Sequence, residues 1–131
     1  MFTPITADDL ADVPLFDGFD EQDLEAIASR CIHVYVRKGI HLLKTGESGF
    51  QFFILLDGTA DVLVGGTKVS QLGPGDVFGE MALLGGGTRA ADVVAASHMA
   101  VATMMVWDFR AMTEEHPDVA SRLRDLITSR S

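Results

Sequence analysis

Short apolar segments separated by glycine-containing turns fill the chain between residues 31 and 107, and this pattern restricts the fold more than any other feature. Strand signals that recur at intervals of roughly 8–12 residues are typical of antiparallel sandwiches and barrels. In the first segment, apolar and polar residues alternate from Ile32 to Arg37, as in a half-buried strand. The other predicted strands are Ile40–Leu43, Phe50–Leu56, Ala60–Val64, Thr67–Leu72, Ala90–Ala96 and Ala100–Trp107.

Helical signals occupy both ends of the chain, and the polar or proline residues that start helices mark their beginnings. At 131 residues, the chain is expected to form a single domain with a core of its own. Residues and spacing together therefore predict an antiparallel β protein with helices before and after the strands. The predicted helices are 7–13, 21–30 and 109–115, capped by Thr6, Asp20 and Asp108, and 117–129, which begins at Pro117.

A glycine-rich turn, a few helix-forming residues, a second glycine run and one arginine follow one another between residues 75 and 94. Glycine lets a backbone approach a ligand closely, and the first amides of a short helix are unpaired donors at a positive helix end. Arg89 adds a forked cation that suits phosphate. Because Glu80 lies nine positions before Arg89, one loop offers an acceptor and a cation to the same small molecule. The stretch predicts a site for a phosphorylated nucleoside.

The formal net charge of −9 argues against a general binder of nucleic acid or of anionic membranes, since both need a basic face. No apolar run approaches about 18 residues, so no membrane span is expected. The N-terminus lacks the basic and apolar regions of a signal peptide. With one cysteine, Cys31, no internal disulfide can form. We expect a cytoplasmic location, with no nucleic-acid or membrane partner.

Enzyme and metal signals are weak. The four histidines are scattered, and none forms a pair at the spacing of metal ligands. The HxH…E cluster that the β-roll enzymes of the cupin class need is also missing. Since no nucleophile and base pair is evident either, we expect no enzymatic activity, no metal and no catalytic cofactor.

The residues placed so far resemble the cyclic nucleotide-binding domain family, and the resemblance covers nearly the whole chain. Its most specific part is FGEMAL at residues 78–83 followed by RAA at residues 89–91, similar to the family's phosphate-binding cassette. Gly46, Gly58 and Gly75 match the family's glycines at strand turns. The resemblance implies one domain over residues 1–131: N-terminal helices (1–30), an antiparallel, jelly-roll-like β-roll (31–107) with its cassette at 78–91, and C-terminal lid or hinge helices (108–131).

The resemblance also implies a role for the cassette. The Glu80 carboxylate would accept a hydrogen bond from the ribose 2′-hydroxyl, Arg89 would pair with the cyclic phosphate, and Gly79 would allow close approach to the ribose. Taken alone, however, Glu80 also suits the start of a short helix. The implied ligand residues are Gly79, Glu80, Met81, Ala82, Arg89, Ala90 and Ala91.

Two further details concern the ligand's base. Relatives that prefer guanine often carry a hydroxyl residue directly after the arginine, so Ala90 favours cyclic AMP over cyclic GMP. The last helix is expected to cover the base, with Leu123 or Ile127 as the lid residue. Movement of the C-terminal helices would then carry the signal to an effector protein or to a second copy of the chain.

Asp92 fits this interpretation least well, because relatives often have threonine, serine or a bulkier residue there. A carboxylate facing the pocket would repel phosphate, whereas one facing outward would not, and the sequence leaves both orientations open. The alternative function is a structural or dimerisation module that keeps the fold but binds no ligand.

Overall fold

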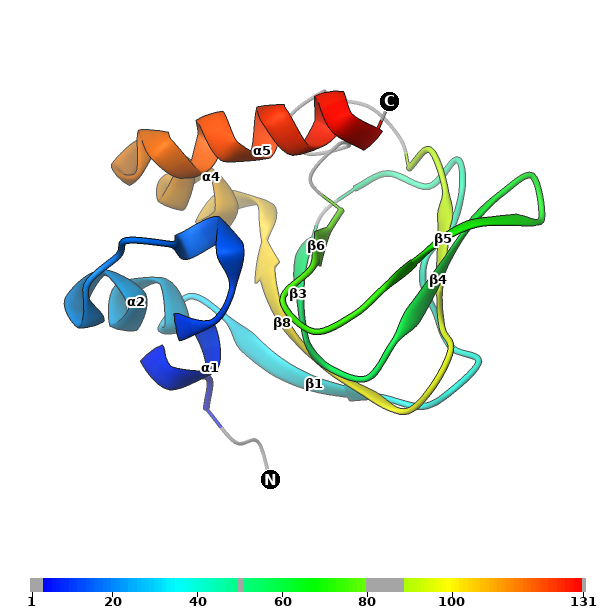
Figure 1. Ribbon diagram of the computed structural model, residues 1–131, viewed down its shortest axis with the longest axis horizontal. Coiled ribbons are helices and arrows are strands. Elements are labelled where there is room, and N and C mark those ends of the chain that lie inside the picture. The colour runs from blue at the N-terminus through cyan, green and yellow to red at the C-terminus, as the bar shows by residue number, and fades with distance from the viewer. Residues whose placement is uncertain (1–3, 50, 80–88, 131) are drawn as a thin grey trace.

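The computed structural model describes residues 4–49, 51–79 and 89–130, with side chains as far as Leu126 in the last helix. In this part of the chain, two antiparallel sheets of four strands face each other as a β-roll (Figure 1). Their strand orders are β1-β8-β3-β6 and β2-β7-β4-β5, so the mainly β, antiparallel fold is confirmed. The strands are β1 (Ile32–Val36), β2 (His41–Leu43), β3 (Gln51–Asp57), β4 (Ala60–Val64), β5 (Thr67–Leu72), β6 (Val77–Phe78), β7 (Asp92–Ala95) and β8 (Met99–Met105).

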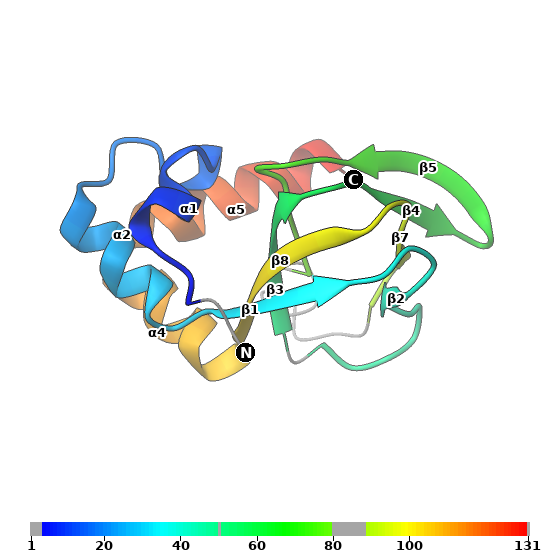
Figure 2. The same ribbon diagram turned by 90° about the horizontal axis from the view of Figure 1, so that it is seen from below.

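The helices gather at one side of the roll, with α5 across the top of the view in Figure 1, and Figure 2 shows the same separation of helices and strands from below. Both N-terminal caps are confirmed, since Thr6 Oγ1 accepts from the amide of Asp9 and Asp20 Oδ1 from that of Asp23. Within the described ranges, no helix combines the length and apolar character needed to cross a membrane. The helical segments are α1 (Ala7–Ala11), the 3-10 turn η1 (Pro14–Phe16), α2 (Glu21–Ala28), α4 (Val106–Glu115) and α5 (Pro117–Arg130).

Several bounds differ from the expectation by one to three residues, and two of the differences have a clear physical cause. Strand β8 passes directly into α4 at Val106, three residues before the predicted start of this helix. Asp108 therefore lies in the first helical turn, where its charge is still favourable, and does not act as the cap. Strand β6 was not predicted, because its two residues are too few to show a period, and it forms through pairing of Phe78 with Phe53.

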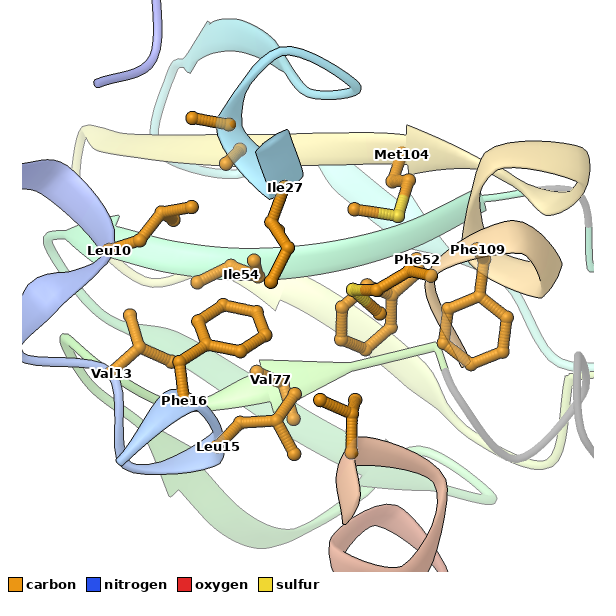
Figure 3. Close-up of a cluster of buried hydrophobic side chains, with 14 of the residues drawn as sticks. Leu10, Val13, Leu15, Phe16, Ile27, Phe52, Ile54, Val77, Met104 and Phe109 are labelled. Carbon is orange, nitrogen blue, oxygen red and sulfur yellow. The ribbon is translucent and has the colours of Figure 1, made fainter. Parts of the chain in front are cut away.

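Strand β3 separates two apolar cores. Successive side chains of a strand point to opposite faces, and here Phe52 and Ile54 point to the helices while Phe53 and Leu55 point into the roll. Both faces of β3 are therefore buried, which explains its continuous apolar sequence. Figure 3 shows the helix-side core, whose buried members include Leu10, Phe16, Ile27, Phe52, Ile54, Met104, Phe109 and Leu123.

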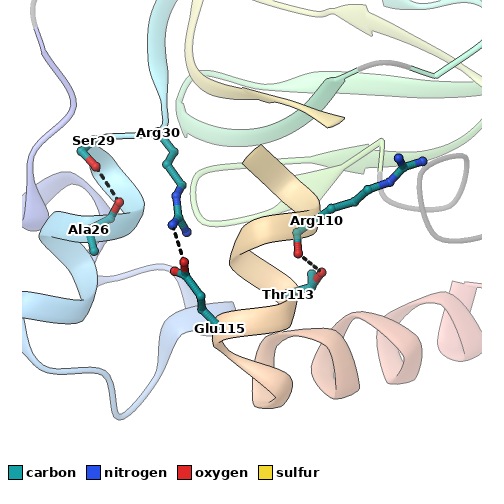
Figure 4. A network of polar contacts seen from close by, with 6 residues as sticks. All are labelled: Ala26, Ser29, Arg30, Arg110, Thr113 and Glu115. Atoms are coloured by element: carbon teal, nitrogen blue, oxygen red, sulfur yellow. Dashed lines mark hydrogen bonds and ion pairs between the residues drawn. The ribbon is translucent and has the colours of Figure 1, made fainter. Parts of the chain in front are cut away.

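The N-terminal and C-terminal helices are joined to each other as well as to the sheet. Arg30, just after α2, forms an ion pair with Glu115 of α4 at 2.7 Å (Figure 4). On α5, Arg122 donates a hydrogen bond from Nη1 to the carbonyl oxygen of Leu15 at 2.8 Å, and its guanidinium lies over the ring of Phe19. The four helices of the described residues and η1 thus form one packed layer against the outer face of the roll.

Leu123 is fully buried in the helix-side core. We expect Leu123→Ala to lower the free energy of unfolding by about 2–5 kcal/mol in the absence of any ligand, because it leaves a cavity in a packed core. Chemical denaturation measures the loss. Ser121→Ala, at an exposed position of the same helix, is the matched control and should stay within about 0.5 kcal/mol of the wild type. A loss below about 1 kcal/mol for Leu123→Ala would contradict its place in the core.

Candidate functional site

Gly79 occupies a position that only glycine fits without strain. It directly follows β6 and has φ +90°, a conformation that residues with a side chain rarely adopt. A Cβ atom at this position would lie 2.9 Å from the carbonyl oxygen of Gln51 and 3.0 Å from Nη1 of Arg89. The missing side chain therefore leaves room for the arginine against the first residue of β3.

Arg89 is buried between these two segments, with only 7% of its surface exposed. Its Nη1 donates to the carbonyl oxygen of Gly79 at 2.7 Å, and its Nη2 donates to the carbonyl oxygen of Gln51 at 2.8 Å. Arginine is seldom buried to this degree unless its donors are used. Gly79 and Arg89 lie near the two ends of the predicted cassette, and the guanidinium of Arg89 joins them by its hydrogen bond to Gly79.

The loop between β2 and β3 holds the main chain of Arg89. The amide of Gly46 donates to the carbonyl oxygen of Arg89 at 2.9 Å, and the amide of Arg89 donates to the carbonyl oxygen of Glu47 at 2.8 Å. Gly46 has φ +86°, which lets the loop turn at this point. Side chain and main chain of Arg89 are therefore both held by hydrogen bonds to neighbouring segments.

Asp92 faces away from the interior of the roll. Its neighbour Val93 is buried in the roll core, and alternation along β7 places Asp92 on the opposite face. Its Oδ1 accepts hydrogen bonds from the amide of Thr45 at 2.6 Å and from Thr45 Oγ1 at 2.8 Å. These two bonds hold the pKa of the Asp92 carboxyl below its usual range, helped by the nearby charges of His41 and Lys44. The orientation that the sequence left open is thus the outward one.

The other predicted ligand residues fall into three groups. Ala90 is exposed and Ala91 half-buried, directly beside Arg89. Glu80, Met81 and Ala82 lie outside the described residues, as does the side chain of Ile127. Leu123, the other expected lid residue, belongs to the helix-side core.

Sequence reasoning missed two residues of this region, Gln51 and Thr45. Gln51 contributes only its main-chain carbonyl, which no side-chain pattern can reveal. The sequence indicated Thr45 only as part of a turn. Its bonds to Asp92 join residues 47 positions apart, which a local pattern does not reveal.

A pocket of about 220 Å³ lies elsewhere, between η1, the turn before β6 and α5. None of the predicted ligand residues that the structure describes lines it, so it does not mark the site at Arg89. Its lining residues are Pro14, Leu15, Gly75, Asp76, Val77, Arg122 and Leu126.

Two chemical points complete the picture of the described part of the chain. Burial raises the pKa of the Cys31 thiol to about 12, so this thiol stays protonated at neutral pH. Among residues 4–49, 51–79 and 89–130, no three histidine, cysteine, aspartate or glutamate side chains come together as metal ligands would.

Comparison with known proteins places this geometry in a family context. The family described as "Cyclic nucleotide-binding domain" matches residues 33–116, which include the whole roll from β2 to β8 and all of α4. A cyclic nucleotide-gated potassium channel from Rhizobium etli is 31% identical over 121 residues, covering 92% of this chain and 34% of the channel. The chain spans about a third or less of the length of the curated relatives that it matches.

Solved structures show the same fold. PKAR CBD2 with Sp-2Cl-cAMPS bound superposes with a TM-score of 0.83 at 27% identity, covering 94% of this chain and 84% of that one. The regulatory subunit of a cAMP-independent protein kinase A from Trypanosoma brucei superposes with a TM-score of 0.84 at 27% identity, covering 95% and 44%.

The close packing around Gly79 can be tested by adding one methyl group. We expect Gly39→Ala to cost about 1–2 kcal/mol of folding free energy, because φ at Gly39 is +92° while nothing lies within 4 Å of the added Cβ. Gly79→Ala should cost at least about 1 kcal/mol more, since its Cβ also displaces Arg89 or β3. Urea denaturation of both variants gives the difference, and equal losses would show that Arg89 is not held against Gly79.

Proposed function

Since the chain belongs to the cyclic nucleotide-binding domain family, we propose that it is a receptor module for a cyclic nucleotide. We propose that it prefers cyclic AMP to cyclic GMP. The ligand binds in the β-roll at the cassette of residues 78–91. Members of this family are regulatory domains that bind cyclic nucleotides. The choice of base, the ligand residues and the output signal are proposals for this chain.

The observation that carries the proposal is the position of Arg89. Its guanidinium is held at 2.7 Å from the carbonyl oxygen of Gly79, the residue that precedes Glu80 in the chain. A forked, permanently charged group beside the start of the cassette suits a cyclic phosphate. Because hydrogen bonds already hold this guanidinium, little side-chain freedom is lost when a ligand arrives.

Glu80 is proposed to recognise the ribose. A 3′,5′-cyclic nucleotide leaves only the 2′-hydroxyl of its ribose free, and a carboxylate accepts a strong hydrogen bond from it. Met81, Ala82 and Ala91 belong to the same cassette, in which main-chain amides would complete the anion site. The apolar interior of the roll, with Val62 half-buried at its wall, suits the base.

The output is proposed to run through the C-terminal helices. Helix α4 packs on β3 through the rings of Phe52 and Phe109, 5.0 Å apart. A ligand shifts the helices only if it binds their two positions with different affinity, and contact between the base and α5 would supply this difference. Leu123 would have to leave the core to reach the base, so Ile127, one turn further along, is the simpler lid candidate.

We also propose a cytoplasmic location and an effector protein as the partner, without catalytic activity in this domain. The Rhizobium etli relative, a gated channel, supports an effector because the chain matches only 34% of its length. A free, half-buried Cys31 is compatible with the cytoplasm.

A ligand-free structural or dimerisation module is the second candidate. It is favoured by the likeness to the regulatory subunit of a cAMP-independent kinase, which has the same fold. Light scattering with and without cyclic AMP separates the two candidates. A stable dimer that is indifferent to the nucleotide favours the second.

Calorimetric titration tests the proposed ligand. We expect the wild type to bind cyclic AMP, and Arg89→Ala to bind at least about tenfold more weakly, since a hydrogen bond to a charged group contributes about 1.5–3 kcal/mol. Arg37→Ala removes the same charge at an exposed position and serves as the control. Circular dichroism verifies that both variants are folded. Absence of any heat at millimolar ligand would refute the proposal.

The preference for adenine is tested at Ala90, which is exposed and has room for a larger side chain. We expect Ala90→Thr to raise the affinity for cyclic GMP by about three- to tenfold, the effect of one added hydrogen bond to the guanine amino group. The affinity for cyclic AMP, measured in the same titrations, should stay unchanged as the internal control. An equal change for both ligands would mean that residue 90 does not contact the base.

A further inference from the structure

The register between β2 and β7 breaks close to Arg89. His41 pairs with Val94 and Leu43 pairs with Val93, with an irregularity between the two pairs. The pairing of β2 with β7 ends at Leu43, and the loop of residues 44–49 begins there. The position of this loop against residues 89–92 must therefore come from interactions other than the ladder of β2 and β7.

Hydrogen bonds of two kinds join the loop to residues 89–92. Two are main-chain bonds, from the amide of Gly46 to Arg89 and from the amide of Arg89 to Glu47, at 2.9 and 2.8 Å. The other two are accepted by Asp92 Oδ1 from the amide and hydroxyl of Thr45, at 2.6 and 2.8 Å. Because their acceptor is ionised, the bonds to Asp92 are of the stronger, charge-assisted type.

These bonds act on neighbouring residues. Thr45 directly precedes Gly46, so fixing the Thr45 amide also fixes the next amide, which is the one that donates to Arg89. On the other side, Asp92 is three residues from Arg89 on the same segment. Asp92 and Thr45 together close the loop on the main chain of the arginine.

We infer that Asp92 is a positioning residue for Arg89: through Thr45 it holds the 44–49 loop on the main chain of Arg89 and so keeps the guanidinium in place for a phosphate. The inference rests on the proposed function for the identity of the ligand, but the positioning itself is a property of the ligand-free protein. It assigns a use to the one residue of the cassette region that fits the ligand chemistry least.

Positioning and simple electrostatics predict opposite results for the removal of Asp92. If the carboxylate acted only as a negative charge near the phosphate, its loss would strengthen the binding of an anion. If it positions Arg89, its loss weakens binding. The sign of the change in affinity therefore separates the two roles.

The experiment compares Asp92→Ala with Asp61→Ala. Asp61 is a half-exposed carboxylate on β4 of the same sheet and is bonded to Gln71 and Lys68 of β5, away from the loop. Calorimetric titration with cyclic AMP should show about three- to tenfold weaker binding for Asp92→Ala, as expected for lost charge-assisted bonds, and wild-type binding for Asp61→Ala. Unchanged or tighter binding by Asp92→Ala overturns the inference.

A double-mutant cycle tests whether Asp92 acts through Arg89. In the Arg89→Ala background, Asp92→Ala should cause no further loss of affinity for cyclic AMP, measured by NMR titration. Asp92→Asn keeps one acceptor oxygen for Thr45 and should restore part of the affinity. A loss that is as large in the Arg89→Ala background as in the wild type overturns the role through Arg89.

Amide hydrogen exchange, measured without ligand, separates failure of this inference from failure of the proposed function. In Asp92→Ala, the amides of Gly46 and Arg89 should exchange about tenfold faster than in the wild type and in Asp61→Ala. If the wild type binds no cyclic nucleotide, the proposed function fails, and the exchange rates alone then decide whether Asp92 positions Arg89. Equal exchange rates in all three proteins overturn the inference.

Discussion

The pair of hydrogen bonds from the Arg89 guanidinium to the carbonyl oxygens of Gly79 and Gln51 is the interaction on which the site depends. It joins the end of β6, the beginning of β3 and the segment before β7, which belong to both sheets of the roll. A buried guanidinium needs such acceptors, because an unsatisfied charge in an apolar surrounding is costly. The absence of a side chain at Gly79 serves the same arrangement, since a Cβ there would lie 2.9 Å from the carbonyl oxygen of Gln51 and 3.0 Å from Nη1 of Arg89.

Strand β3, whose first residue Gln51 belongs to this site, contributes side chains to both apolar cores. The faces of β3 alternate, so Phe53 packs on Phe78 inside the roll while Phe52 packs on Phe109 of α4. Interiors are packed densely, so a displacement on one face of a strand is felt on the other. Strand β3 therefore connects the arginine, through Gln51, with helix α4, and the C-terminal helices are themselves joined to the N-terminal segment by Arg30 and Arg122.

Much of the fold follows from local sequence patterns, and the exceptions have identifiable causes. Period-two alternation, glycine turns and helix caps depend on near neighbours, so the bounds of β4 and β5 and both N-terminal caps were predicted correctly. The predicted start of α4 was wrong because β8 continues directly into this helix, and a helix that begins in this way needs no side-chain cap. Strand β6 was missed because only its partner β3 makes it a strand.

For the site, the sequence by itself determined which residue types are present and so predicted the chemistry, and the tertiary structure decided the geometry. The order of glycine, glutamate and arginine was enough to indicate an anion site and the cyclic nucleotide-binding domain family, because the residue types decide which chemical groups are available to a ligand. Local pattern could not show that Asp92 bonds to Thr45 or that Leu123 lies in the core. Nor could it show that Arg89 meets the carbonyl of Gln51, 38 positions away. Such contacts join segments distant in the chain, and only the packing of both sheets and the helices brings them together.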